Sequence, residues 1–421
     1  MAAVKTTAAV LVVLLVGLAA ACAGDDARVE PVASRQCAPL VYEGESEPDV
    51  VVVSDLPRRG IGAETTELMV EAIEFVLRKR EFRAGELRVG YQSCNDTVGD
   101  EPFDPLLCRR NAQAYADNEA VLGIVGPWNS ACAQEQIPIV STRAAGPLAM
   151  ISPSNTYEGL TRTSASAPPY PDGVRSYARV VALNSAQGAA SAQLAKDVGA
   201  RRAVVLHQDL RDDYVRTLAE EFDASARTLG LETVRFPWPV RTSYSELAAS
   251  VAAAQPDVVY VAGETQGNAK TLIEDLRAAL PPGIELIAPD GFANSFVAEE
   301  LGAAGERMLV TSTSVPSELL PRAGERFVRE FGHAPGEPGF LGAPEAAQAT
   351  AVLLDAIARS DGTRASVVEE VFATKVENGI LGSFSFDRFG DIVPAPIGVY
   401  RFENGKIVAH DLVRLSGGSG S

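Results

Sequence analysis

From Asp49 onward the chain alternates between short runs of β-branched apolar residues and longer runs with apolar residues at helical spacing. Strands are predicted by runs such as DVVVVSDLP at 49–57, AVLGIVGP at 120–127 and PDVVYVAG at 256–263. Helical stripes lie between such runs, for example at Leu272 and Leu276. Nearly continuous apolar strands joined by helices predict parallel sheets covered on both faces. Because one such series ends near Ala182 and another follows, the pattern predicts an α/β fold with two doubly wound parallel-sheet lobes.

Polar residues follow two neighbouring strands of the first series. Ser130 stands in GPWNSACA, where a strand gives way to a helix, and Asn155 and Thr156 end AMISPSNT at the next strand. Hydroxyls and free backbone N–H groups at a helix start can bind an anion. Each motif can also be read as ordinary helix capping or turn formation. Two such ends in adjacent units favour a shared carboxylate site, since ligands bind beyond the carboxyl ends of parallel strands.

The second series places acidic groups at its strand ends. Glu264 and Asp290 stand at two strand tips, and Tyr214 follows the strand that carries His207. Opposite the donors of the first lobe, these groups suit a ligand with a cationic amine and an anionic carboxylate. The alternative for both acids is an ordinary surface position in an acidic protein.

The sequence gives little support for catalysis. The three histidines are scattered without metal-ligand spacing, and neither a G-x-S-x-G elbow nor a P-loop occurs. The pair Gly60 and Gly62 lacks the third glycine of a dinucleotide fingerprint. Arg58 and Arg59 could reach a ligand anion, but a solvated loop is the favoured reading, and Trp128 could line a pocket or pack in the core. We therefore expect no enzymatic activity, no cofactor and no metal.

Composition and the first residues indicate the setting. The 421 residues carry a formal charge of −18, which argues against nucleic acid or an anionic membrane as partner. The apolar stretch 6–21 is short for a membrane span and runs into Cys22, so residues 1–21 are predicted to be a signal peptide. The run before Cys22 resembles a bacterial lipobox, which predicts a lipid anchor, with plain cleavage as the alternative. Residues 22–47 are predicted to be a tether and 416–421 a flexible tail.

Four cysteines remain after Cys22, an even number that favours two disulfides in an exported chain. Cys94 and Cys108 flank one loop, so we predict a Cys94–Cys108 bond together with a Cys37–Cys132 bond. The alternative Cys94–Cys132 pairing stays open, because spacing alone does not determine connectivity.

From about Pro48 to Leu415 the chain resembles the periplasmic substrate-binding proteins of branched-chain amino acid ABC transporters, which are type I periplasmic binding proteins. The resemblance rests on the stretches PLAMISPSNTYEGLT, AVLGIVGPWNSACA, QSCNDT and IAPDGFANS. Their order and spacing along the chain match those of the family's motifs. It implies two lobes joined by a three-strand hinge near Ala182, Thr311 and Ile380. Lobe 1 would then comprise 48–182 plus 312–380, and lobe 2 would comprise 183–311 plus 381–415.

The resemblance also implies roles for single residues. The positions that match the family's ligand-binding residues are Ser130, Asn155 and Thr156 for the carboxylate, with Tyr214 and Asp290 in the second lobe. Asp290 would neutralise the α-ammonium group. Glu264 stands where leucine-type binders place a tyrosine, which favours a more polar or amine-bearing ligand.

The function implied is capture of an amino acid-like solute by hinge closure, followed by docking on an ABC permease driven by an ATPase. Such a protein would be extracytoplasmic and touch the membrane only through its N-terminal lipid. A ligand-sensing receptor module uses the same fold and is the alternative. An exported enzyme is the third hypothesis.

Overall fold

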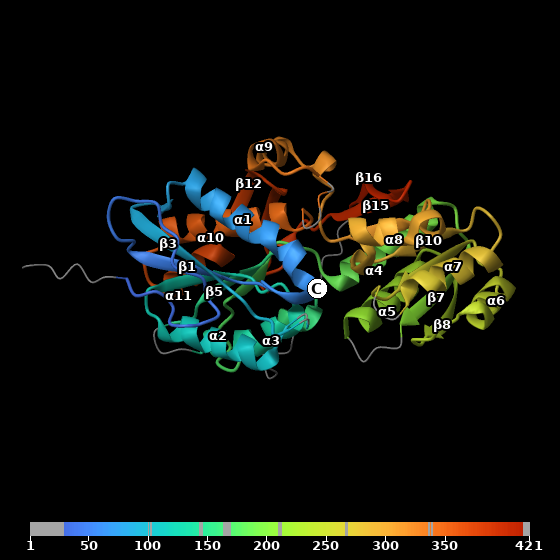
Figure 1. Cartoon of the computed structure of the whole chain (residues 1–421), viewed down its shortest axis with the longest axis horizontal. Coiled ribbons are helices and arrows are strands. Elements are labelled where there is room, and N and C mark those ends of the chain that lie inside the picture. Colours follow the sequence, from blue (N-terminus) through green and yellow to red (C-terminus); the bar gives the residue numbers. More distant parts are fainter. Residues whose placement is uncertain are drawn as a thin grey trace, which may run out of the picture.

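Two lobes lie side by side, lobe 1 on the left and lobe 2 on the right of Figure 1. The computed structural model describes residues 29–99, 101, 103–142, 146–162, 170–208, 213–265, 268–335, 337 and 340–415. The predicted signal peptide, the Cys22 anchor and the 416–421 tail lie outside these described residues. Within the described part of the chain, no helix is long and apolar enough to cross a membrane.

Lobe 1 is built on a six-stranded sheet in the order β2-β3-β1-β4-β5-β6, parallel except for β2. Its strands are β1 Val50–Asp55, β2 Arg83–Ala84, β3 Leu87–Cys94, β4 Val121–Val125, β5 Ala149–Ser152 and β6 Tyr177–Arg179. Its helices are α1 Ala63–Lys79, α2 Pro105–Asp117, α3 Ser130–Val140, α9 Arg322–Phe331, α10 Ala343–Arg359 and α11 Arg364–Phe372. A three-stranded sheet adds β12 Lys375–Gly379, β13 Gly382–Phe386 and β14 Ile392–Val393.

The run of four valines in β1 illustrates why the sheet is covered on both faces. Val50 and Val52 pack in the cluster that contains residues of α1, α10 and α11, whereas Val51 and Val53 pack against α2 and α3. Side chains alternate between the faces of a strand, so an uninterrupted apolar strand needs helices on both sides.

Lobe 2 repeats this plan with a seven-stranded sheet in the order β16-β15-β11-β10-β9-β7-β8. Its strands are β7 Arg202–Gln208, β8 Glu232–Trp238, β9 Val258–Ala262, β10 Glu285–Ala288, β11 Leu309–Ser312, β15 Ile397–Glu403 and β16 Lys406–Val413. Its helices are α4 Asn184–Asp197, α5 Asp213–Thr228, α6 Ser245–Ala253, α7 Ala269–Ala279 and α8 Ser295–Gly305. β15 and β16 form an antiparallel hairpin through Asn404 and Gly405. The predicted fold class, two doubly wound lobes with three connections between them, is confirmed.

The third connection between the lobes lies later than predicted. Phe384 and Phe386 of β13 pack in the core cluster of lobe 1, and the chain enters the sheet of lobe 2 only at Ile397. The predicted boundary at residue 380 is therefore replaced by a crossover at 394–396. The aromatic side chains of β13 bury themselves against lobe 1, which the motif spacing did not reveal.

The segment before β1 packs on lobe 1 from residue 29 onward. Val32 is buried, and residues Cys37 and Val41 form antiparallel bridges with Cys94 and Tyr91 of β3. The described part of the predicted 22–47 tether is therefore an added layer of lobe 1, because its apolar side chains gain burial against the edge of the sheet.

Both predicted disulfide pairings are wrong. The bonds join Cys37 to Cys94, with Cα atoms 3.9 Å apart, and Cys108 to Cys132, with Cα atoms 5.5 Å apart. Cys37 lies on the segment that runs along β3, while Cys108 and Cys132 lie on α2 and α3, which pack side by side. The Cys94–Cys132 alternative fails for the same reason. Partners were set by these tertiary contacts and not by separation along the chain.

Candidate ligand-binding site between the lobes

The loop after β4 presents Ser130 as the first residue of α3. Asn129 caps this helix, its side-chain Oδ1 accepting from the Ala131 N–H at 2.8 Å. Ser130 is half-buried, and among the described residues its hydroxyl has no protein partner. The cap residue frees the serine hydroxyl, so Ser130 can bind a ligand oxygen.

The loop after β5 is shaped by Ser152 and Asn155. The Ser152 hydroxyl donates to the Pro127 carbonyl at 2.9 Å and accepts from the backbone N–H of Asn155 at 2.9 Å. The Asn155 side chain donates to the Trp128 carbonyl at 2.8 Å and accepts from the Tyr177 hydroxyl at 3.0 Å. Its side chain and backbone N–H are thus occupied within the protein. Asn155 therefore ties the loops after β4 and β5 together, and Thr156 is the better candidate for ligand contact.

Arg179, which was not identified from the sequence, forms hydrogen bonds with the loop after β5. Its buried guanidinium pairs with Asp391 at 2.9 Å and donates to the carbonyls of Asn155 at 3.0 Å and Tyr157 at 2.9 Å. A fully buried arginine keeps its charge and needs such partners. The sequence feature that could have pointed to Arg179 is its place in the otherwise apolar run YARVVA. Arginine is buried in such a strand only when its charge is paired.

In lobe 2 the Tyr214 hydroxyl donates to Asp290 Oδ1 at 2.5 Å. Burial raises the pKa of the Asp290 carboxyl above its usual value, while hydrogen bonds from the side chains of Tyr214 and Gln187 counteract that rise. Burial also raises the pKa of Tyr214 well above its ordinary value. Asp290 is consequently a partly desolvated carboxyl group whose Oδ1 atom is held in position by the Tyr214 hydroxyl.

Glu264 lies beside Asp290, as its place on the neighbouring strand end predicts. The Glu264 N–H donates to the Gln208 side chain at 2.7 Å, which fixes the loop after β9. A Cβ placed on Gly291 would lie 3.4 Å from Glu264 Cα, so the loops after β9 and β10 touch. The structure therefore brings the three second-lobe residues of the predicted site together.

The first turn of α4 connects the two halves of the site. The Asn184 N–H donates to the Thr156 carbonyl of lobe 1 at 3.0 Å, and the Gln187 side chain donates to the Thr311 carbonyl of lobe 2 at 3.0 Å and lies near enough to Asp290 to lower the pKa of that carboxyl. Residues three apart on a helix are separated by about one turn, or roughly 5 Å. Thr156 and Asp290 thus lie close to opposite ends of the same helical turn.

Asn184 is a second residue that the sequence reasoning missed. Its side chain is fully buried at the junction of the lobes, and within the described part of the chain neither of its polar atoms has a hydrogen-bond partner. A buried amide without partners is costly, which marks this point as one where a further polar group fits.

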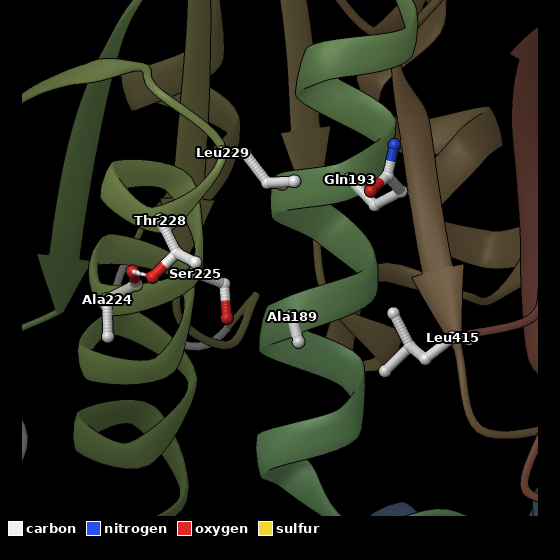
Figure 2. Close-up of a pocket in the computed structure, with 7 residues that line it drawn as sticks. All are labelled: Ala189, Gln193, Ala224, Ser225, Thr228, Leu229 and Leu415. Carbon is white, nitrogen blue, oxygen red and sulfur yellow. Dashed lines mark hydrogen bonds between the residues drawn. The ribbon is translucent and has the colours of Figure 1, made fainter. Parts of the chain in front are cut away.

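A separate groove lies between α4 and α5, shown in Figure 2. It has a volume of about 270 Å³ and is lined by Ala189, Gln193, Ala224, Ser225, Thr228, Leu229 and Leu415. None of these residues carries a charge or belongs to the predicted site. A zwitterion would find no charged partner there.

Among the described residues, Asp96, Cys108 and Cys132 bring potential metal-ligand atoms within 4.8 Å of one another. The two sulfur atoms are joined in a disulfide, so they are not available as thiolate ligands.

Two of three comparisons with known proteins found matches to this chain. A family model described as periplasmic binding protein matches residues 57–406. A comparison with curated proteins found no match. Structures similar to this chain include a leucine binding protein from Thermotoga maritima, with 24% sequence identity over 87% of this chain and 99% of that one and a TM-score of 0.71.

Two further similar structures carry ligands. A substrate-binding protein from Desulfitobacterium hafniense in complex with Leu has 20% identity, covers 86% of this chain and 99% of that one, and has a TM-score of 0.70. A solute binding protein from R. palustris in complex with benzoate has 20% identity, covers 87% and 96%, and has a TM-score of 0.68. The family match spans most of the sequence and agrees with the fold. The chain belongs to the periplasmic binding protein family.

Proposed function

We propose that this protein is an extracytoplasmic solute-binding component of an ABC importer that captures an amino acid or similar small polar solute between its lobes. The observation that supports this proposal is the first turn of α4, which bonds the Thr156 carbonyl of lobe 1 through Asn184 and lies beside the Asp290 carboxyl of lobe 2 through Gln187. A zwitterion could bind Ser130 and Thr156 with its carboxylate and Asp290 with its ammonium group.

Hinge closure would act through the three connections between the lobes. Lobe 1 would bind the carboxylate first, and lobe 2 would then close over the amine. A ligand stabilises the closed arrangement only through contacts that are better made there. Asp290 supplies such a contact, because a buried carboxyl gains most from a cation when water is excluded.

Transport requires membrane partners, and the proposal names an ABC permease with its ATPase. Leucine and benzoate, found with similar structures, both carry a carboxylate, which fits the first-lobe donors. Attachment to the membrane would come from a lipid on Cys22. Metabolic labelling with a radioactive fatty acid should detect that lipid, and Cys22→Ser should abolish the label.

The binding proposal is tested by thermal-shift screening of amino acids and aromatic acids, followed by calorimetry of any ligand found. A bound ligand raises the unfolding temperature by mass action. Thr156→Val and Asp290→Asn should each weaken binding of an amino acid about 10- to 100-fold, since a hydrogen bond to a charged group contributes about 1.5–3 kcal/mol. Ser154→Ala, a neighbour in the same loop, is the matched control and should bind normally. Unchanged affinity in both site variants would refute this site.

A further inference from the structure

Hydrogen bonds fix the loop after β1, which lies at the edge of lobe 1 nearest lobe 2. The Arg58 N–H donates to the Asn95 side chain at 2.8 Å, and the Thr97 hydroxyl donates to the Arg59 carbonyl at 3.3 Å. The Thr66 hydroxyl holds the Pro57 carbonyl from α1. These bonds to the backbone give the loop a defined position at the start of α1.

The Arg58 side chain is an unpaired cation within this loop. It is half-buried, its Nη1 atom is shielded from solvent, and among the described residues that atom has no hydrogen-bond partner and the guanidinium has no ion pair. Other sheltered arginines of lobe 1 are paired: Arg179 binds Asp391, and Arg364 binds backbone carbonyls. Arginine stays charged in proteins, so a shielded nitrogen without a partner is costly.

The chain has ample acidic residues to pair with Arg58, since it contains 55 Asp and Glu against 37 Lys and Arg. The neighbouring Arg59 is exposed and can be hydrated. Arg58 therefore lacks a partner because of where it lies in the fold, and not because the protein contains too few acidic residues. An anionic group on a ligand would supply the missing partner of the Arg58 guanidinium.

The position of Arg58 differs from that of the carboxylate donors. In the sheet order β1 is separated from β5 by β4, and neighbouring strands lie about 4.8 Å apart. A Cβ placed on Gly62 would lie 3.4 Å from Trp128 Cζ3, so the Arg58 loop borders the loop that leads to Ser130. Figure 1 shows the start of α1 at the centre of the molecule, facing lobe 2.

We propose that Arg58 binds a second acidic group on the ligand, so that the solute is an amino acid with an acidic side chain or a similar dicarboxylate. The inference rests on the proposed function, because it adds a contact to the same site. A planar guanidinium binds a carboxylate through two parallel hydrogen bonds, which makes arginine suited to this role. The contact between the Arg58 loop and the loop that leads to Ser130 puts Arg58 at the same edge of lobe 1 as the α-carboxylate donors.

The test compares L-glutamate with L-glutamine by calorimetry, with L-leucine as a third probe. The full-length mature protein should bind L-glutamate at least 10-fold more tightly than L-glutamine. Arg58→Met should remove that preference by lowering the affinity for L-glutamate about 10- to 100-fold, the effect of a charged hydrogen bond of roughly 1.5–3 kcal/mol. Binding of L-glutamine by this variant should stay within about 2-fold, as expected of uncharged contacts elsewhere.

Arg59→Met is the matched control, because it removes the same charge from the exposed neighbour. It should leave the glutamate preference unchanged. Arg58→Lys keeps the charge but loses the paired geometry, and it should give an intermediate affinity. If the wild type binds L-leucine or L-glutamine as tightly as L-glutamate, or if Arg58→Met keeps a glutamate preference, this inference is overturned while the proposed function stands. If none of the three probes binds and the wider screen also fails, both are overturned.

Discussion

Replacing Glu345 with glutamine should change how the stability of this protein depends on pH. Glu345 lies in the first turn of α10 and is 1% exposed. Among the described residues its Oε2 atom has no hydrogen-bond partner, while Ser314 and Val315 of the connection after β11 lie near enough to lower the pKa of the carboxyl group in part. Burial raises its pKa from 4.5 to about 7, because water no longer stabilises the charged form.

The size and the sign of the effect follow from that pKa. A difference between 4.5 and about 7 corresponds to about 3.5 kcal/mol, at roughly 1.4 kcal/mol for each pKa unit. The folded protein holds this proton more tightly than the unfolded chain does. The stabilising contribution is therefore fully present below pH 4.5 and is lost as the pH rises through about 7. Glutamine resembles the protonated acid and does not titrate.

The assay is urea unfolding of wild type and Glu345→Gln at pH 4, 5, 6, 7 and 8, followed by tryptophan fluorescence. The two proteins should have similar free energies of unfolding at pH 4, and the variant should be about 3.5 kcal/mol more stable at pH 8. Glu318→Gln, at an exposed position of the same region, is the control and should follow the wild type. A difference between Glu345→Gln and wild type that stays constant over this pH range would refute the reasoning.

Two further predictions concern contacts that the structure revealed. Arg179→Met should lower the free energy of unfolding by about 3–5 kcal/mol in denaturant titrations, because the buried Asp391 carboxylate keeps only Arg162 as an ion-pair partner among the described residues and the carbonyls of Asn155 and Tyr157 lose their donor. An Arg179→Met variant as stable as the wild type would contradict this account. In Cys108→Ser, a thiol reagent applied under denaturing conditions without reductant should label Cys132, while Cys37 and Cys94 stay unlabelled. Labelling of Cys94 in that variant would instead restore the rejected pairing.

Much of the fold could be predicted from the sequence because its pattern is repeated and local. Four consecutive valines in β1 require burial on both faces, and such strands are stable only between two helical layers. The hairpin of β15 and β16 was equally accessible, since Asn404 and Gly405 both adopt positive φ angles that this dipeptide favours.

Part of the site was also accessible from order along the chain. Parallel strands put all their carboxyl ends at one edge, so polar residues after β9 and β10 were expected to meet. The structure places Glu264 and Asp290 side by side. Asn155 was assigned to the ligand from the same rule, yet its side chain joins Trp128 and Tyr177. A residue's position was predictable there, but its hydrogen-bond partners were not.

The sequence by itself determined the alternation of strands and helices, the two-lobed α/β class and the edge at which the polar residues gather, because these depend on residue periodicity and chain order. Only the tertiary structure decided which cysteines pair, where the third connection lies and which buried cations find partners. These features depend on contacts between segments far apart in the chain, such as Cys37 with Cys94 and Arg179 with Asp391. The energy of such contacts comes from packing and desolvation in three dimensions, which spacing along a chain does not encode.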